Sequence, residues 1–80
     1  MSVMFEVYYQ APANPEREAT LNRLVAEFGG QLDYREEPDP HGPDSVCLTY
    51  EFDDWSAAEA AARAVRAKGE HVEGPTDYGA

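Results

Sequence analysis

Four side chains of this 80-residue chain could together hold a divalent metal ion: Glu6, Glu51, His71 and Glu73. His71 and Glu73 are two positions apart in a predicted strand, so their side chains point to the same face. One imidazole and three carboxylates form a donor set that a divalent ion accepts. Solvated surface charge is the simpler explanation, because no His-x-His or Cys-x-x-Cys spacing accompanies these residues. Binding of a metal or another small ligand is therefore the second hypothesis, and no cofactor is expected.

Tyrosine and histidine side chains also offer acid–base chemistry. The candidates are Tyr34, Tyr50, His71 and Tyr78, provided that they share a pocket between a sheet and its helices. No nucleophile and base stand at a characteristic spacing. Cys47 is the only cysteine, and a cysteine inside a strand is more often packed than reactive. A small dimeric enzyme is the third hypothesis, and no catalytic residue is assigned.

The net charge of the chain favours some classes of binding partner over others. The chain has 16 acidic and 6 basic residues, a formal net charge of −10. Nucleic-acid binding depends on Lys and Arg contacts with phosphate, and anionic membranes select basic segments, so neither partner is expected. Basic protein surfaces remain compatible with the charge. Solubility or adaptation to salt explains the same composition without any partner.

The element that would position these residues is the segment Ser45–Asp53, which alternates between apolar and polar residues. This period of two is typical of a half-buried strand, and Val3–Gln10 shows the same alternation. We expect both to be central strands. Their predicted inward residues are Val3, Phe5, Val7, Tyr9, Val46, Leu48, Tyr50 and Phe52.

Two helices are predicted between the strands. The first begins at Asn14-Pro15, because Asn caps free N–H groups and Pro is tolerated at the first helical position, and it ends at Gly29-Gly30. The second begins at Asp54-Trp55-Ser56, where Ser56 stands three residues before Glu59 as in a capping box, and it runs to about Lys68. The predicted buried stripes are Leu21, Leu24, Val25 and Phe28 in the first helix, and Ala58, Ala61, Ala62 and Val65 in the second.

Two weaker strands and a loop complete the pattern. Gln31–Glu37 is predicted to be an edge strand with Leu32 and Tyr34 inward and with Asp33, Arg35 and Glu37 outward. Pro38–Asp44, which is rich in proline, is predicted to be a loop. Glu70–Glu73 is expected to be a short last strand, with Gly74-Pro75 ending its regular pairing.

The order strand, helix, strand, strand, helix, strand resembles the ferredoxin-like, or split βαβ, fold. The resemblance implies an α+β domain spanning residues 1–80, with an antiparallel sheet in the order 4-1-3-2 and both helices on one face. That fold hosts many functions, so function must be argued from the residues.

One face of such a sheet stays uncovered, and we expect a binding surface there. The candidates are Glu6, Tyr8, Arg35, Thr49, Glu51, His71 and Glu73. The first hypothesis is a small, acidic, non-enzymatic interaction or regulatory module that acts through this face or a sheet edge. Its partner would be a protein, either a basic one or a second copy of the chain. RNA is disfavoured because only Arg35 would offset the acids around Tyr8.

The segment TYEFDDWSAAEAAARAVRAKGEHVE resembles the strand and Ala-rich helix of acidic bacterial ribonuclease regulators of the RraB type. The resemblance covers under a third of the chain and implies binding to, and restraint of, an enzyme. It transfers no site residue. Met1–Gln10 lacks the basic start of a signal peptide and no apolar run could span a bilayer, so a cytoplasmic location is expected.

Overall fold

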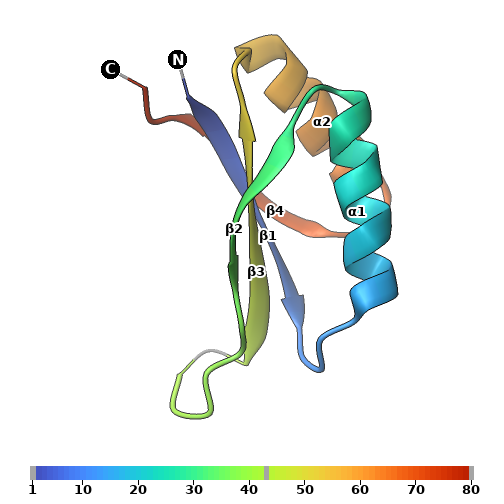
Figure 1. Ribbon diagram of the computed structural model, residues 1–80, viewed down its shortest axis with the longest axis vertical. Coiled ribbons are helices and arrows are strands. Elements are labelled where there is room, and N and C mark those ends of the chain that lie inside the picture. The colour runs from blue at the N-terminus through green and yellow to red at the C-terminus, as the bar shows by residue number, and fades with distance from the viewer. Residues whose placement is uncertain (1, 43, 80) are drawn as a thin grey trace.

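The computed structural model describes residues 2–42 and 44–79; Met1, Pro43 and Ala80 lie outside the described residues, Pro43 within the predicted loop and the other two at the ends of the predicted domain. The elements are β1 (Val3–Gln10), α1 (Pro15–Glu27), β2 (Gln31–Glu36), β3 (Ser45–Phe52), α2 (Trp55–Ala67) and β4 (His71–Asp77). The strands form one antiparallel sheet in the order β2-β3-β1-β4, which is 4-1-3-2 read from the other edge (Figure 1). The α+β class and the sheet order are thus confirmed, and the arrangement is compatible with a ferredoxin-like fold.

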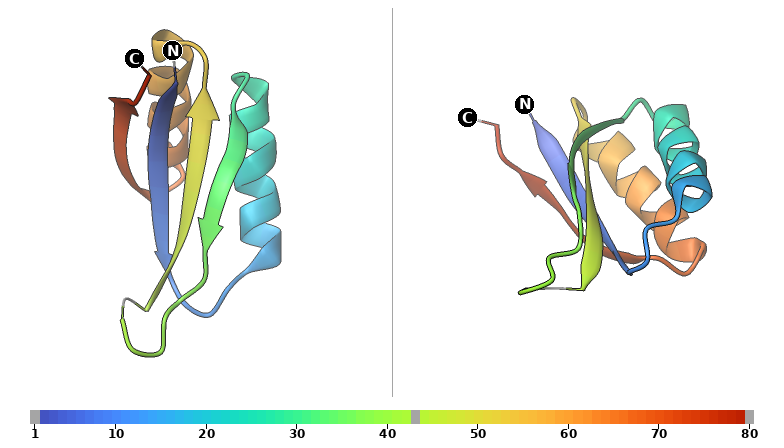
Figure 2. Two further views of the ribbon diagram at one scale, coloured as in Figure 1. Left: turned by 60° about the vertical axis from the view of Figure 1, so that its left-hand side comes forward. Right: turned by 60° about the horizontal axis from the view of Figure 1, so that its bottom comes forward.

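Both helices lie on one side of the sheet, and among the described residues nothing covers the other side (Figure 2). The two central strands are β1 and β3, as expected, and their register places Val7 opposite Leu48 and Phe5 opposite Tyr50. The side chains of these pairs are buried and point toward the helices. The side chains between them point to the opposite side, because alternate residues of a strand face opposite sides of the sheet. The sheet therefore has a core face and an open face.

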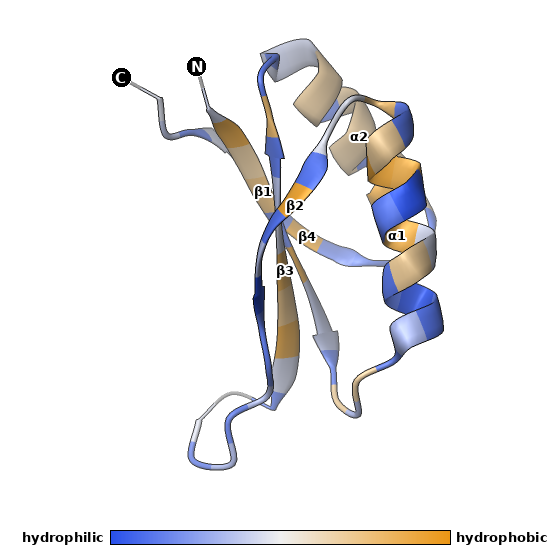
Figure 3. Cartoon of the chain, in the orientation of Figure 1, coloured by the Kyte–Doolittle hydropathy of each residue, from blue (hydrophilic) through white to orange (hydrophobic). Residues whose placement is uncertain are grey.

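The core lies between β1, β3 and the two helices. The Phe5 ring stacks on Phe52 at 5.4 Å between centroids and meets Tyr50 at 5.7 Å. Helix α1 contributes Leu21 and Val25, and α2 contributes small residues that let it lie close to the sheet; all eight predicted inward residues of the central strands are buried. In Figure 3 the edge strand β2 is largely hydrophilic, in contrast to β1 and β3.

Local signals explain where the helices begin and end. The Asn14 side chain accepts a hydrogen bond from the Arg17 backbone N–H at 3.1 Å, which confirms the predicted cap of α1. Gly29 follows the helix with a φ of 85°, as predicted for a left-handed helix end. The predicted capping box of α2 is wrong. Asp54 caps this helix instead, because its carboxylate accepts from the Ala57 N–H at 2.9 Å.

A bulge in β2 changes which residues of that strand face the helices. Leu32 pairs with Tyr50 and Tyr34 pairs with Thr49, so β2 has one extra residue, Asp33, in this interval. The extra residue reverses the alternation beyond it. Tyr34, predicted to face inward, is 59% exposed on the open face. Arg35, predicted to face outward, is on the helix side.

Strand β4 is longer than predicted. Pairing with β1 continues through Gly74-Pro75 to Asp77, although that dipeptide was expected to end it. An irregularity between Met4 and Glu6 absorbs the interruption. Gly74 has a φ of 104°, which strains any other residue, and a Cβ there would crowd the Met4 carbonyl oxygen at 3.1 Å.

We predict that Leu48→Ala destabilises the fold strongly. Leu48 is fully buried in the central strand, and removing a buried leucine costs about 2–5 kcal/mol through lost burial and the cavity left behind. Urea denaturation of both proteins measures the difference. Thr49→Ala, at the next position but on the open face, is the control and should cost much less. Equal losses from both substitutions would contradict the assigned faces.

Candidate interaction face and its pocket

The open face is the side of the sheet opposite the helices. It is formed by alternate residues of all four strands, as the pairing registers define. Its members are Met4, Glu6, Tyr8 and Gln10 on β1; Gln31, Tyr34 and Glu36 on β2; Ser45, Cys47, Thr49 and Glu51 on β3; and His71, Glu73 and Thr76 on β4.

Six of the seven predicted binding residues lie on this face: Glu6, Tyr8, Thr49, Glu51, His71 and Glu73. The placement of Arg35 was wrong. Arg35 pairs with Leu48, whose side chain is buried under the helices, and its guanidinium reaches α1. The bulge at Asp33 is the cause. Binding at any of these residues stays a prediction, but the open face lacks the cation that the sequence analysis expected there.

All six Lys and Arg residues belong to the helix layer or turn toward it. Arg17 and Arg23 are in α1, Arg63 and Arg66 are in α2, and Lys68 directly follows α2. The strand registers place four carboxylates on the open face, those of Glu6, Glu36, Glu51 and Glu73. Acidic residues lie on both sides of the sheet, but the Lys and Arg residues keep to the helix side, so the described part of the open face is acidic apart from His71.

Glu6 and Glu73 are directly opposite each other on β1 and β4. Partial burial, followed by repulsion from Glu73, raises the pKa of the Glu6 carboxyl above its usual value. Glu73 also lies 3.1 Å from the Nε2 atom of His71, and Glu51 accepts a hydrogen bond of 2.6 Å from the Ser2 hydroxyl. Glu6 is thus a carboxylate whose charge the surrounding protein disfavours.

The metal hypothesis gains no geometric support. Among residues 2–42 and 44–79, no three His, Cys, Asp or Glu side chains are grouped so that they could hold a metal ion. Glu6 and Glu73 are adjacent across the strands, but Glu51 is opposite Met4, further along the sheet. The four proposed ligands share one face without converging on one point.

The predicted acid–base residues do not meet either. Tyr50 is fully buried on the helix side, where its hydroxyl donates to the Asn22 Oδ1 atom at 2.6 Å. Tyr34 and His71 are on the open face, but on the two outermost strands, β2 and β4. The third hypothesis required these residues to share a pocket between the sheet and the helices, and Tyr34, Tyr50 and His71 do not form one.

A different pocket opens on the open face, at the end nearest the β2–β3 loop. It has a volume of about 300 Å³ and is lined by Tyr8, Glu36, Glu37, Asp39, Ser45 and Cys47. Glu36, Cys47 and Tyr8 form one cross-strand row, because Cys47 is the register partner of both neighbours. The hollow exists because two small side chains, Cys47 and Ser45, stand between larger ones.

Two residues of this pocket have altered proton affinity. Burial, the neighbouring Cys47 and the carboxylates of Glu6 and Glu73 together raise the pKa of Tyr8 to about 12. Burial also raises the pKa of the Cys47 thiol, which is only 8% exposed. Both groups are therefore neutral at physiological pH, and Cys47 is not an activated nucleophile. The charge of the pocket comes from its three carboxylates.

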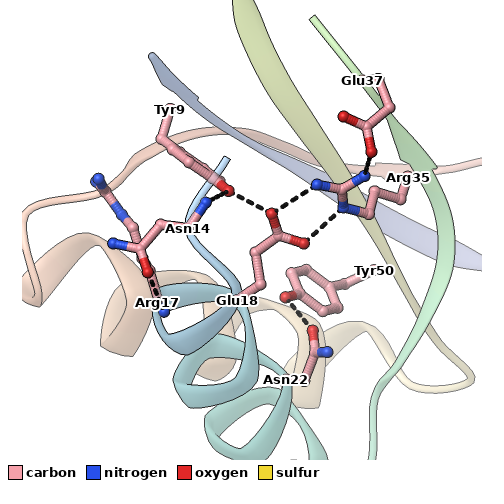
Figure 4. Close-up of polar contacts among 8 residues, drawn as sticks. All are labelled: Tyr9, Asn14, Arg17, Glu18, Asn22, Arg35, Glu37 and Tyr50. Atoms are coloured by element: carbon pink, nitrogen blue, oxygen red, sulfur yellow. Dashed lines mark hydrogen bonds and ion pairs between the residues drawn. The ribbon is translucent and has the colours of Figure 1, made fainter. Parts of the chain in front are cut away.

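Sequence reasoning missed a polar cluster between α1 and the sheet (Figure 4). Its centre is Glu18, which is 9% exposed. Arg35 donates to both Glu18 oxygens, from Nε at 2.6 Å and from Nη2 at 2.9 Å, and the Tyr9 hydroxyl donates to the Oε2 atom. Arg35 also contacts Glu37. These hydrogen bonds from Arg35, followed by that from Tyr9, hold the pKa of Glu18 below its usual value despite burial.

One signal could have revealed this cluster. Glu18 precedes Leu21 by three positions, so it lies on the buried stripe of α1, where an acid needs a partner. Its partner was not evident, because the bulge that turns Arg35 inward has no clear sequence signature. All described buried side-chain polar atoms have hydrogen-bond partners, so this cluster is complete in itself and stabilises the fold.

Comparison with known proteins gives no relative: no protein-family model matches the chain, and no curated protein is significantly similar to it. The resemblance to RraB-type regulators therefore has no family support. Within the described ranges, no helix combines the length and apolar character that crossing a membrane would require.

We predict that Glu18→Gln destabilises the fold at neutral pH by about 1.5–3 kcal/mol, the usual contribution of hydrogen bonds to a charged group. Because the pKa of Glu18 is lower in the folded chain than its reference of 4.5, its contribution is present above that value and is lost as the pH falls through the folded pKa. Urea denaturation from pH 7 to pH 3 should show the two proteins converging in acid. Glu16→Gln, exposed on the same helix, is the control. A constant difference at every pH would contradict this assignment.

Proposed function

We propose that the protein is a non-enzymatic interaction module whose open face binds a basic segment of another protein. One observation carries the proposal: every Lys and Arg is in or turned toward the helix layer, while four carboxylates share the open face. Charged surfaces of opposite sign steer association and select partners. Among the described residues, the acidic face has no Lys or Arg to neutralise it, so a cationic partner complements it.

The same charge distribution argues against other occupants of this face. Phosphate backbones and anionic lipids would be repelled. Two copies of the chain packed face to face would bring Glu6, Glu51 and Glu73 near their own counterparts, which costs free energy unless cations intervene. A second copy would have to use a sheet edge. A basic protein segment needs no such compensation.

The state of Glu6 supports binding over simple solubility. A solvated surface acid carries no energetic cost, whereas ionised Glu6 is partly buried and faces Glu73. Proteins tolerate such local destabilisation at functional sites more than elsewhere. A cation bound between these carboxylates would remove the repulsion.

The proposal also includes a fold family and a cellular location. We take the arrangement as ferredoxin-like, with the chain acting in the cytoplasm. In the RraB-type regulators a small acidic protein restrains an enzyme by binding it. A similar role agrees with an open face that carries carboxylates and no described Lys or Arg. The partner would then present an exposed basic surface.

We predict that a 12-residue peptide of alternating arginine and glycine binds the protein, with affinity that falls as salt rises. Glu6→Lys and Glu73→Lys should each weaken binding at least about fivefold, because each replaces an attraction by a repulsion. Isothermal titration calorimetry at two salt concentrations measures this. Glu27→Lys, an exposed change of equal charge in the helix layer, is the matched control. Equal weakening by all three variants would show that only net charge matters and would contradict a site on the open face.

We also predict that Glu6→Gln raises the melting temperature at pH 7. The pKa of Glu6 is higher in the folded chain, so its ionised form destabilises the fold above that pKa, and the cost disappears as the pH falls below it. The difference in melting temperature should therefore shrink toward pH 3.5. Scanning calorimetry at both pH values measures it, with Glu59→Gln on α2 as the control. A lower melting temperature for Glu6→Gln at pH 7 would contradict the strain assigned to Glu6.

A further inference from the structure

The pocket over Cys47 has the size and composition of a receptor for one side chain. Its volume, about 300 Å³, is at the lower end of the range for small-molecule sites. The small residues Ser45 and Cys47 line it, and Cys47 stands between Tyr8 on β1 and Glu36 on β2. The carboxylates of Glu36, Glu37 and Asp39, from β2 and the loop after it, form the acidic rim of the lining.

These lining groups recognise a flat cation with an apolar stem. An arginine guanidinium pairs with carboxylates through parallel hydrogen bonds, and it stacks on aromatic rings more readily than an ammonium does. Tyr8 lines the pocket and is only partly buried, with the His71 ring as its aromatic neighbour at 6.0 Å between centroids, so part of its ring can make a cation–π contact in the pocket. A lysine ammonium can also lie over an aromatic ring, but it lacks the planar group that stacks on the ring and pairs with a carboxylate through two parallel hydrogen bonds.

Two of the rim carboxylates already have contacts within the chain, and the third has no hydrogen-bond or ion-pair partner among the described residues. Glu37 contacts Arg35, and Asp39 accepts a hydrogen bond of 2.8 Å from the His41 N–H. Glu36 is exposed and is the register neighbour of Cys47. Glu36 is therefore the carboxylate best placed to pair with a cation above Cys47.

We propose that this pocket receives the guanidinium of one arginine from the basic segment that binds the open face, with Tyr8 stacking on it and Glu36 pairing with it. This inference rests on the proposed function and explains how the open face would select one basic segment over another. The acidic face would attract any basic segment, and the pocket would fix the register of the one that carries an arginine at the right position.

The test compares the alternating arginine–glycine peptide with a peptide that has lysine in place of every arginine. Calorimetry on the unmodified protein should show at least about fivefold tighter binding of the arginine peptide, the order of the one additional hydrogen bond that a guanidinium makes with a carboxylate. Two variants should abolish that preference without changing the net charge. Tyr8→Leu removes the aromatic wall, and Ser45→Leu fills the hollow. Ser56→Leu, the same exchange at an exposed position of α2, should leave the preference intact.

The outcomes separate the pocket from the face. If Tyr8→Leu and Ser45→Leu both fold, as melting curves would show, and both keep the arginine preference, the pocket proposal is overturned while binding that depends on Glu6 still stands. Equal affinity of the two peptides for the unmodified protein overturns it as well. If neither peptide binds, the proposed function and the pocket fail together. Loss of the preference in either folded variant supports the pocket.

Discussion

The structure depends on the ion pair between Arg35 and the buried carboxylate of Glu18. Burying a carboxylate alone would be costly, so Glu18 requires a cation, and the guanidinium supplies two hydrogen bonds while Tyr9 supplies a third. This ion pair connects the edge strand β2 with α1. It also places Arg35, the one arginine in the four strands, on the helix side and not on the open face. The pair stabilises the helix side of the sheet, and the described residues of the acidic open face include no Lys or Arg.

The bulge at Asp33 makes this division possible. One extra residue turns Arg35 toward the helices and, by the same reversal, brings Tyr34 and Glu36 to the open face. Glu36 thereby becomes the neighbour of Cys47 and a wall of the pocket. A single irregularity in an edge strand thus links the stabilising ion pair to the composition of the binding surface, as bulges near functional sites often do.

The sequence predicted what depends on strict periodicity. The alternation in β1 and β3 identified their inward residues, and with them the open-face positions of Glu6, Tyr8, Thr49 and Glu51. The spacing of two between His71 and Glu73 placed that pair on the same face of β4. Prediction failed where pairing departs from a simple period, as at Asp33 and at Gly74-Pro75, because register is set by the neighbouring strand and not by the segment itself. The pocket was equally inaccessible, since it arises from residues that only the register brings into one row.

The central claim is that the open face, and not the helix layer, meets a basic partner. The most direct measurement is a map of backbone amide shifts in nitrogen-15-labelled protein during titration with the arginine–glycine peptide. The account predicts that the largest shifts follow the four strands, centred on Tyr8, Cys47 and Glu73, while amides of the exposed sides of α1 and α2 change little. Shifts concentrated on the helices, or spread evenly over the acidic surface, would contradict it.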